Sequence, residues 1–206
     1  MLFCDMKIEG LKVRILAHTL ILGVAGLFTF CGDNTTEEST HFVYSVEGVS
    51  KHVQSITGLL QRGVQYDHEE QSLTISVSNS FSEMATIKVT NWDFQNPPED
   101  GILEDIYDAT YNAELGENNS PYVKCIDLTG ANAGKSLCSS GFVTFTIDGK
   151  LYTSVFTGNE EGTITITECD TKNLSISGSF SVKVQESIGN KLKLTGTFSN
   201  VKYTVF

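Results

Sequence analysis

Residues 174–184 read LSISGSFSVKV, and residues 192–205 read LKLTGTFSNVKYTV. In both stretches an apolar residue or glycine alternates with serine, threonine or lysine over most of the length. A period of two places one set of side chains in a core and the other in water, which is typical of antiparallel β-sheet. The end of the chain therefore predicts successive β-strands.

The same alternation recurs in short stretches toward the N-terminus. Turn-forming residues separate these stretches, at Asp148–Gly149, 159–162, 170–173, Gly189–Asn190 and Ser199–Asn200. Strands without a βαβ rhythm predict an all-β fold, an antiparallel β-sandwich or flattened β-barrel that residues 41–206 form as a single domain. The alternating apolar positions are Phe42, Tyr44 and Val46; Leu73, Ile75 and Val77; Ile87 and Val89; Val143, Phe145 and Ile147; and Ile164 and Ile166.

Two regions depart from this pattern. Residues 49–61, VSKHVQSITGLLQ, are compatible with one or two helical turns, although Gly58 weakens that interpretation. Residues 96–141 form a long irregular insertion, and within it residues 99–117 contain seven acidic residues and no basic one. We weigh two interpretations of the insertion: a solvated loop, or a cation site or partner-binding edge.

Three aromatic residues in or near the insertion are a candidate binding surface: Trp92, Tyr107 and Tyr111. Exposed aromatic side chains on a β scaffold stack on sugars or anchor a partner. The preferred interpretation is that these side chains belong to the core.

The first 30 residues differ from the rest of the chain. Lys7, Lys12 and Arg14 precede an apolar run over residues 15–30. A basic segment followed by a short apolar run is typical of a secretory signal peptide, whether the chain starts at Met1 or at Met6. The run of about 16 residues is short for a membrane span of about 20, so an uncleaved anchor is the second choice.

Cys31 follows the apolar run directly, and its position resembles the lipobox of bacterial lipoproteins, in which the cysteine carries the lipid. The chain departs from the lipobox at Phe30, where the pattern has alanine, glycine or serine. Residues 32–40, GDNTTEEST, contain no apolar residue and are typical of a flexible tether. We expect residues 1–30 to be the signal peptide and residues 31–40 to hold the lipid-attachment site and the tether.

The composition excludes some classes of function. Fourteen basic residues against 25 acidic ones give a formal net charge of −11, which argues against nucleic-acid binding. No zinc-protease, EF-hand or serine-hydrolase motif is present, and we expect no cofactor, no metal and no enzymatic activity. The run Asp67–Glu70 offers metal-binding side chains, but consecutive residues of a strand point to opposite faces, so a charged turn is the preferred interpretation.

The cysteines of the body would enter an oxidising compartment on export. Cys125 and Cys138 flank a glycine-rich loop, and we predict a disulfide between them. In the chain-entropy model such a bridge stabilises the fold by roughly 3 kcal/mol. Cys169 is then the odd thiol.

Three motifs in the C-terminal third carry a resemblance to a known family: GTITITECD at 162–170, ISGSFSV at 176–182 and LTGTFSNVKY at 194–203. The chain resembles a domain-of-unknown-function family of exported Bacteroidota lipoproteins, most sharply over residues 141–206. The resemblance implies an exported all-β protein, and it supplies no catalytic residues.

These observations predict an exported, lipid-anchored protein of the cell envelope, at the outer membrane or cell surface, with a non-enzymatic binding or structural role. Its partners would be the membrane, through the lipid, and an envelope protein, a glycan or a small apolar ligand. One alternative is a barrel that carries a small apolar ligand in its interior. A second alternative is a secreted hydrolase with a carboxylate or His–carboxylate site.

Overall fold

The computed structural model describes residues 39–80, 82–109, 125–134, 136–138, 140–154, 162–186 and 189–206, all within the unit Glu37–Phe206. The predicted signal peptide, Cys31 and Tyr111 lie outside the described residues, as does most of the predicted turn at 159–162.

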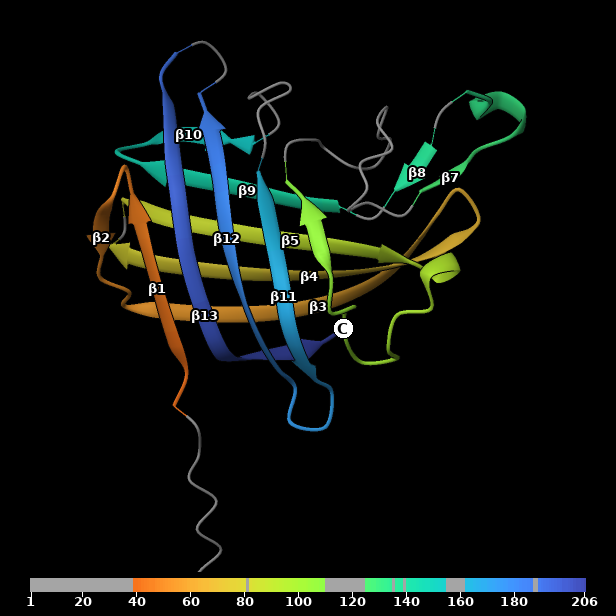
Figure 1. Ribbon diagram of the computed structural model, residues 1–206, viewed down its shortest axis with the longest axis horizontal. Coiled ribbons are helices and arrows are strands. Elements are labelled where there is room, and N and C mark those ends of the chain that lie inside the picture. The colour runs from red at the N-terminus through yellow and green to blue at the C-terminus, as the bar shows by residue number, and fades with distance from the viewer. Residues whose placement is uncertain are drawn as a thin grey trace, which may run out of the picture. The chain divides into compact units, whose positions relative to one another are not determined.

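The described residues form an all-β fold, as the alternation predicts, in which eleven strands join one sheet and fold into two layers (Figure 1). The strands of one layer run across those of the other. In spatial order, the front layer holds β2 (Val49–Lys51), β1 (His41–Val46), β13 (Lys191–Val205), β12 (Ser175–Gln185), β11 (Thr163–Asp170) and β6 (Ile106–Asp108). The back layer holds β3 (Ser55–Gln65), β4 (His68–Ser80), β5 (Glu83–Trp92), β9 (Ser140–Ile147) and β10 (Lys150–Thr153).

Three small elements complete the described fold. The strands β7 (Cys125–Asp127) and β8 (Ser136–Cys138) pair as a separate hairpin, with the 3-10 turn η2 (Gly130–Asn132) between them. A second 3-10 turn, η1 (Asp93–Gln95), follows β5.

Two pairings at the corners join the layers into a flattened barrel. At one corner the end of β13 pairs with β3, with Tyr203 opposite Gly58. At the other corner β10 pairs with β12 through Thr153 and Gln185. The strands therefore close into a ring in the order β13, β3, β4, β5, β9, β10, β12. The β13–β3 pairing is parallel, which the expectation of an antiparallel sheet did not include.

The corner at Gly58 explains why the prediction of helical turns over residues 49–61 is wrong. These residues form β2 and β3. A Cβ at Gly58 would lie 2.6 Å from the carbonyl oxygen of Lys202 and 2.8 Å from the Cβ of Tyr203. The glycine that weakens a helix is thus the residue that lets β13 approach β3.

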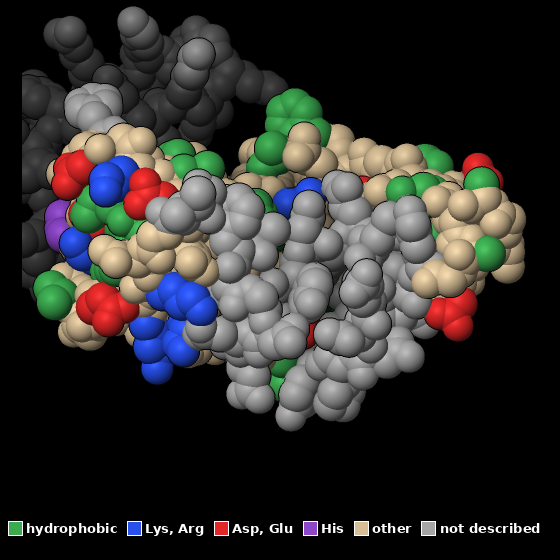
Figure 2. Space-filling view, turned by 90° about the horizontal axis from the view of Figure 1, so that it is seen from above, with side chains coloured by type: hydrophobic (Ala, Val, Ile, Leu, Met, Phe, Trp, Pro, Cys, Tyr) green, Lys and Arg blue, Asp and Glu red, His purple; other side chains and the backbone are tan. Residues whose placement is uncertain are grey.

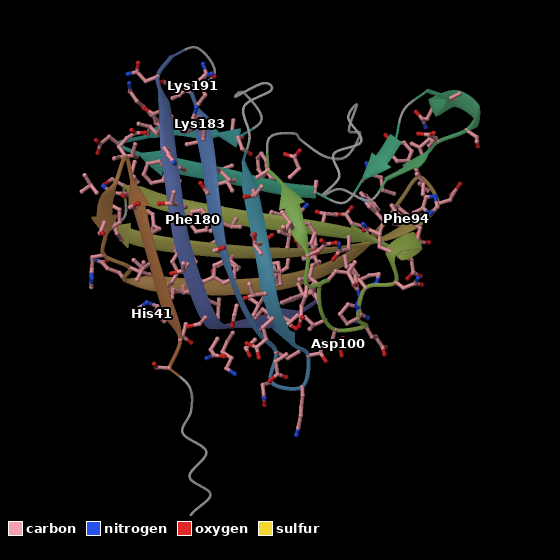
Figure 3. The ribbon with its side chains drawn as sticks, in the orientation of Figure 1. His41, Phe94, Asp100, Phe180, Lys183 and Lys191 are labelled. Atoms are coloured by element: carbon pink, nitrogen blue, oxygen red, sulfur yellow. The ribbon has the colours of Figure 1, made fainter. Side chains whose placement is uncertain are left out.

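Two of the three motifs in the C-terminal third, at 176–182 and 194–203, pair with each other. Gly178 lies opposite Phe198, and Phe180 lies opposite Gly196, because β12 and β13 run antiparallel. Each ring covers the glycine across from it: a Cβ at Gly178 would lie 2.7 Å from the Phe198 ring. Phe180, labelled in Figure 3, is buried between the layers.

The predicted turn at Ser199–Asn200 is instead a β-bulge inside β13. Asn200 has φ of 51°, and the register between β12 and β13 shifts at this point, between Ile176 and Gly178. A bulge bends its strand and increases the local twist. The bend carries β13 from its pairing with β1, which ends at Ser199, to its pairing with β3, which begins at Tyr203.

The two-residue turns that close the hairpins follow the predicted turn chemistry. Asp148–Gly149 joins β9 to β10 with positive φ at both residues, and Glu47–Gly48 joins β1 to β2 in the same way. Positive φ at both central residues matches the right-handed twist of the flanking strands. Residues 171–174 form the turn between β11 and β12, close to the predicted 170–173.

The acidic insertion is partly built into the barrel. Gly101, Ile102, Tyr107 and Ala109 are buried, and β6 extends the front layer beside β11. The interpretation of the insertion as a solvated loop is therefore wrong for residues 101–109. Residues 110–124 lie outside the described part of the chain.

The end of the barrel that holds the β1–β2 turn carries an ion pair between the layers. Nζ of Lys51 lies 3.2 Å from Oε1 of Glu83, and the Tyr44 hydroxyl donates to Glu83 at 3.2 Å. Acidic and basic side chains also lie close together on the surface at this end (Figure 2).

Candidate functional site

A row of polar side chains interrupts the core at the opposite end of the back layer. The register places Arg62 opposite Gln71, and Gln71 opposite Asn91. Two residues earlier along β3 the same face carries the buried pair Leu60 and Leu73. Because side chains two residues apart share a face, the core face turns from apolar to polar at this end.

The loop that follows η1 is held against this polar row. Nε2 of Gln71 donates to the Glu99 carbonyl at 2.8 Å. The Arg62 guanidinium donates to the same carbonyl and to Oδ1 of Asp100, the latter at 2.6 Å. Oδ1 of Asn91 accepts from the Leu103 amide at 2.9 Å. The polar row therefore fixes the path of residues 99–103.

Local sequence explains where this loop begins. Asn96 caps the end of η1 and adopts the left-handed conformation, with φ of 53° and ψ of 57°. Asparagine tolerates this conformation better than most residues. Pro97 and Pro98 follow and lack the amide that a longer helix would need. The chain consequently turns back over the ends of β3 and β4.

A groove of about 640 Å³ lies beside this loop. One side of it is the β3–β4 hairpin, and the other is η1 with the start of the loop. Phe94 and Asp100, labelled in Figure 3, mark η1 and the loop. Its volume is in the range of sites for small ligands. The lining residues are Arg62, Gly63, Val64, Glu69, Glu70, Gln71, Asp93, Asn96, Pro97 and Glu99.

The charges of the groove are unbalanced. Its lining has four carboxylates and one cation, Arg62, which is paired with Asp100. Glu70 is partly neutralised, because Nζ of Lys88 lies 3.6 Å away. Within the described residues the carboxylates of Glu69 and Glu99 make neither a hydrogen bond nor an ion pair. The groove is therefore acidic.

A histidine–carboxylate pair borders the groove. Nδ1 of His68 lies 2.9 Å from Oδ1 of Asp93. The Phe94 ring packs edge-on against the imidazole, with 5.9 Å between the two ring centroids. Asp93 also accepts from the Phe94 amide at 2.7 Å. Such a pair can orient an imidazole as a general base. No serine, threonine or cysteine lines the groove, so a side-chain hydroxyl or thiol nucleophile is missing from its lining.

The run Asp67–Glu70 is a charged turn that leads into the groove. Tyr66 and Asp67 have φ of 50° and 65° and form the turn between β3 and β4. Glu69 and Glu70 then line the groove. Among the side chains that the structure describes, no group of three or more histidine, cysteine, aspartate or glutamate residues is arranged to hold a metal ion.

The candidate aromatic surface is wrong for the two residues that the structure describes. Trp92 and Tyr107 are each 1% exposed. The Tyr107 hydroxyl lies 2.9 Å from Oδ1 of Asn91 and 2.8 Å from the Leu103 carbonyl oxygen. Burial raises the pKa of Tyr107. Apolar surface of this size is more stable in the core, where the polar row supplies a partner for the hydroxyl.

The two cysteines of the predicted disulfide lie on facing strands. Cys125 of β7 is the direct register partner of Cys138 of β8. Direct partners in an antiparallel pair have Cα atoms about 4.5–5.5 Å apart, a separation that a disulfide can span. The register supports the bridge, which stays a prediction because these side chains are outside the described part.

Cys169 is a free, half-buried thiol. Its Sγ accepts from the Ile102 amide at 3.4 Å and lies 3.7 Å from the Tyr203 hydroxyl. That hydroxyl donates to the Asp100 carbonyl at 2.6 Å. These contacts attach the loop at 99–103 to β11 and β13 as well.

Comparison of the chain with protein-family models, with curated proteins and with solved structures finds no match. A search of the described residues for a helix long and apolar enough to cross a membrane finds none.

Proposed function

We propose that this protein is an exported, lipid-anchored binding protein of the cell envelope, and that its β domain takes a ligand in the groove between the β3–β4 hairpin and η1. The observation that carries the binding role is the groove itself. Its polar row holds the adjoining loop in place, while Glu69 and Glu99 stay unpaired within the described residues. Binding needs no nucleophile, and none of the lining residues has a hydroxyl or a thiol.

The sequence supports the envelope location. A basic segment and an apolar run precede Cys31, and residues 32–40 would separate the lipid from the β domain. The resemblance to exported Bacteroidota lipoproteins points to the same location. The lipid would hold the groove near a membrane face, where partners of the envelope are available.

The interior is a poorer candidate for the ligand than the groove. Within the described residues the side chains between the layers form one packed cluster, in which Leu60, Phe145 and Leu194 have no exposed surface. A carrier of an apolar ligand would need that space free of side chains. The surface groove therefore replaces the interior as the proposed site.

A groove-filling variant tests the binding role. The full-length wild type, Val64→Trp and Met84→Trp would be compared on arrays of peptides, amines and glycans. Val64 lines the groove and is 73% exposed, so tryptophan would fill the groove without disturbing the core. Met84 is 46% exposed and does not line the groove, which makes it the matched control. We expect a ligand class that the wild type and the control retain and Val64→Trp loses. Equal retention by all three, or no ligand class, would contradict the proposal.

A separate experiment tests the location. The full chain and Cys31→Ser would be expressed in a Gram-negative host and compared by intact mass and membrane fractionation. We expect a diacylglycerol mass on the wild type alone, together with loss of the variant from the membrane fraction. Two unlipidated, cytoplasmic proteins would contradict the export and the anchor while leaving the groove to be judged by the arrays.

The His68–Asp93 pair favours a hydrolase as the second candidate. An imidazole held by a carboxylate at a groove could activate water. Turnover of a chromogenic ester, glycoside or peptide that His68→Gln abolishes would establish this candidate. A ligand that binds without turnover, with an affinity that His68→Gln leaves unchanged, would contradict the hydrolase and support the binding role.

A further inference from the structure

The β3–β4 hairpin that borders the groove has an unpaired edge. β3 pairs with β4 along its whole length, but on its other side it pairs with β13 only at residues 58–60. Within the described part of the chain no strand pairs with that side beyond Leu60, and Figure 1 shows the hairpin running on past the end of β13. Residues 61–65 of β3 therefore lie at an edge of the sheet, which we call the open edge.

The backbone groups that the open edge presents belong to Arg62 and Val64. The Leu60 carbonyl accepts from the Phe206 amide on the side away from β4. Because successive residues of a strand direct their N–H and C=O groups to opposite sides, those of Arg62 and Val64 point the same way as those of Leu60. Within the described residues these groups of Arg62 and Val64 make no hydrogen bond. An added strand would find both donors and acceptors here.

Exposed apolar side chains lie along the open edge. Phe206, beside Leu60, is 81% exposed, and Val64 is also exposed. A strand added at the open edge would pack beside these two side chains and remove part of their surface from water. The backbone bonds and the apolar contact would therefore act together.

The open edge lacks the features that usually protect a strand from pairing with another chain. Such features are short length, lysine or proline on the edge, and β-bulges. The strands at the two ends of the sheet order, β2 and β6, have three residues each. The open edge has the sequence QRGVQ, without lysine or proline, and its one charge, Arg62, is paired with Asp100. This edge is thus available for pairing.

We infer that the open edge docks an extended segment of a partner polypeptide, which adds a strand beside β3 at the groove. Arg62, Gly63 and Val64 line the groove, so the same segment would occupy both. The inference rests on the proposed binding role of the groove and names the class of its ligand.

The charges favour a partner over a second copy of the chain. The groove lining has four carboxylates and one cation, and each copy has a formal net charge of −11. Pairing of two open edges would bring two acidic grooves together, and like charges repel. A segment that carries lysine or arginine would meet complementary charge instead.

Peptides with blocked amides test the pairing. The full-length protein would be applied to an array of peptides about ten residues long, the upper range for a strand, in which valine alternates with lysine or threonine. Each peptide has a matched control in which every backbone amide is N-methylated, so that the side chains stay and the donors are lost. We expect capture by unmethylated peptides and at least tenfold weaker capture by their controls.

Hydrogen exchange locates the added strand. With the captured peptide bound, the amides of Arg62 and Val64 should exchange at least about tenfold more slowly. Those of Gly63 and Gln65 face β4 and should change less than about twofold. Val64→Pro removes one outward N–H and should lose the peptide, whereas Val64→Thr keeps that N–H and should retain it. If Val64→Pro fails to fold, the methylated peptides and the exchange pattern still decide.

Several results would overturn the inference. Capture of no peptide, equal capture of the methylated controls, or protection away from Arg62 and Val64 would each contradict it. A wild type that is dimeric in sedimentation, with a monomeric Val64→Pro, would place a second copy at the open edge. The proposed binding role would survive these results if the arrays give an amine or a glycan that Val64→Trp loses, so the two failures are distinguishable.

Discussion

At the scale of single residues, glycines decide where strands approach each other. Gly58 and Gly178 both face backbone or ring atoms at distances that a Cβ would violate. Gly63, in contrast, has nothing within 4 Å of the position that a Cβ would take. Glycines in strands thus divide into those that the packing requires and those that it does not.

Substitution at Gly178 tests this distinction. Gly178→Ala places a methyl group against the Thr165 carbonyl oxygen and the Phe198 ring, and it should destabilise the fold by about 1–3 kcal/mol through overpacking. Gly63→Ala should change the free energy of unfolding by less than about 1 kcal/mol, because alanine fits there. Urea unfolding measures both. Equal effects of the two substitutions would contradict the packing of Phe198 on Gly178.

Asp170 predicts a pH-dependent contribution at the same scale. Its carboxylate accepts from the Asn173 and Lys172 amides and from Nδ2 of Asn173, and these bonds lower its pKa. A carboxyl whose pKa falls on folding stabilises the protein above its unfolded pKa of about 3.9 and loses this effect as the pH drops through the folded pKa. The wild type should therefore exceed Asp170→Asn in stability at pH 7, and the difference should shrink below about pH 4. A difference that is constant from pH 7 to pH 2 would refute the role of the charge.

At the scale of elements, alternation predicts strands well and partners poorly. The strands around Leu73, Ile87 and Val143 are evident from their sequences because each buries one face and so alternates apolar and polar residues. Their pairings are only partly local: β4 and β5 form a hairpin, whereas β5 pairs with β9 across the insertion. The parallel pairing of β3 with β13 joins residues more than a hundred positions apart, and no local signal marks it. The polar row of Arg62, Gln71 and Asn91 depends on the register of three strands, so the groove could not be predicted from any single motif.

The carboxylates near Glu69 were visible in the sequence, although only as a charged turn. Their place at the groove depends on the loop after Asn96, which hydrogen bonds from Arg62 and Gln71 hold beside the β3–β4 hairpin. Trp92 and Tyr107 show the reverse case. Their aromatic character is evident from the sequence, but it does not distinguish a core from a surface.

The β7–β8 hairpin provides a prediction at this scale. If Cys125 and Cys138 form the disulfide that their register favours, iodoacetamide should label Cys169 and neither of them in the denatured, unreduced protein. Mass spectrometry of tryptic peptides measures the labelling. Reduction should expose both thiols, and Cys138→Ala should cost roughly 3 kcal/mol in the chain-entropy model. Labelling of all three cysteines before reduction would exclude the bridge.

At the scale of the described β domain, two layers are held together at their ends by different means. One end has the ion pair of Glu83 with Lys51, to which Tyr44 adds a hydrogen bond. Burial and the nearby Glu83 carboxylate raise the pKa of Tyr44, so its hydroxyl stays a donor through the physiological range. The other end has the polar row, whose hydrogen bonds hold a loop and leave a groove. One end therefore holds a buried ion pair, and the other holds the proposed binding groove.

Removal of the Glu83 charge tests the role of the first end. The Glu83 side chain is only 10% exposed, so Glu83→Gln should destabilise the protein by about 1–3 kcal/mol. Glu186→Gln is the matched control, because the Lys150–Glu186 pair spans 3.8 Å at an exposed site and should contribute less than about 1 kcal/mol. Thermal or urea unfolding compares them. Equal stability of the two variants would show that the buried pair does not fasten the layers.

We propose that the groove is where this protein binds its ligand. Amide chemical-shift mapping of the isotope-labelled, full-length protein with the ligand class that the arrays select tests this most directly. Binding in the groove predicts shifts concentrated at residues 62–64, 69–71 and 93–99, with the β1–β2 end unchanged. Shifts spread over the acidic surface, or concentrated away from these residues, would contradict it.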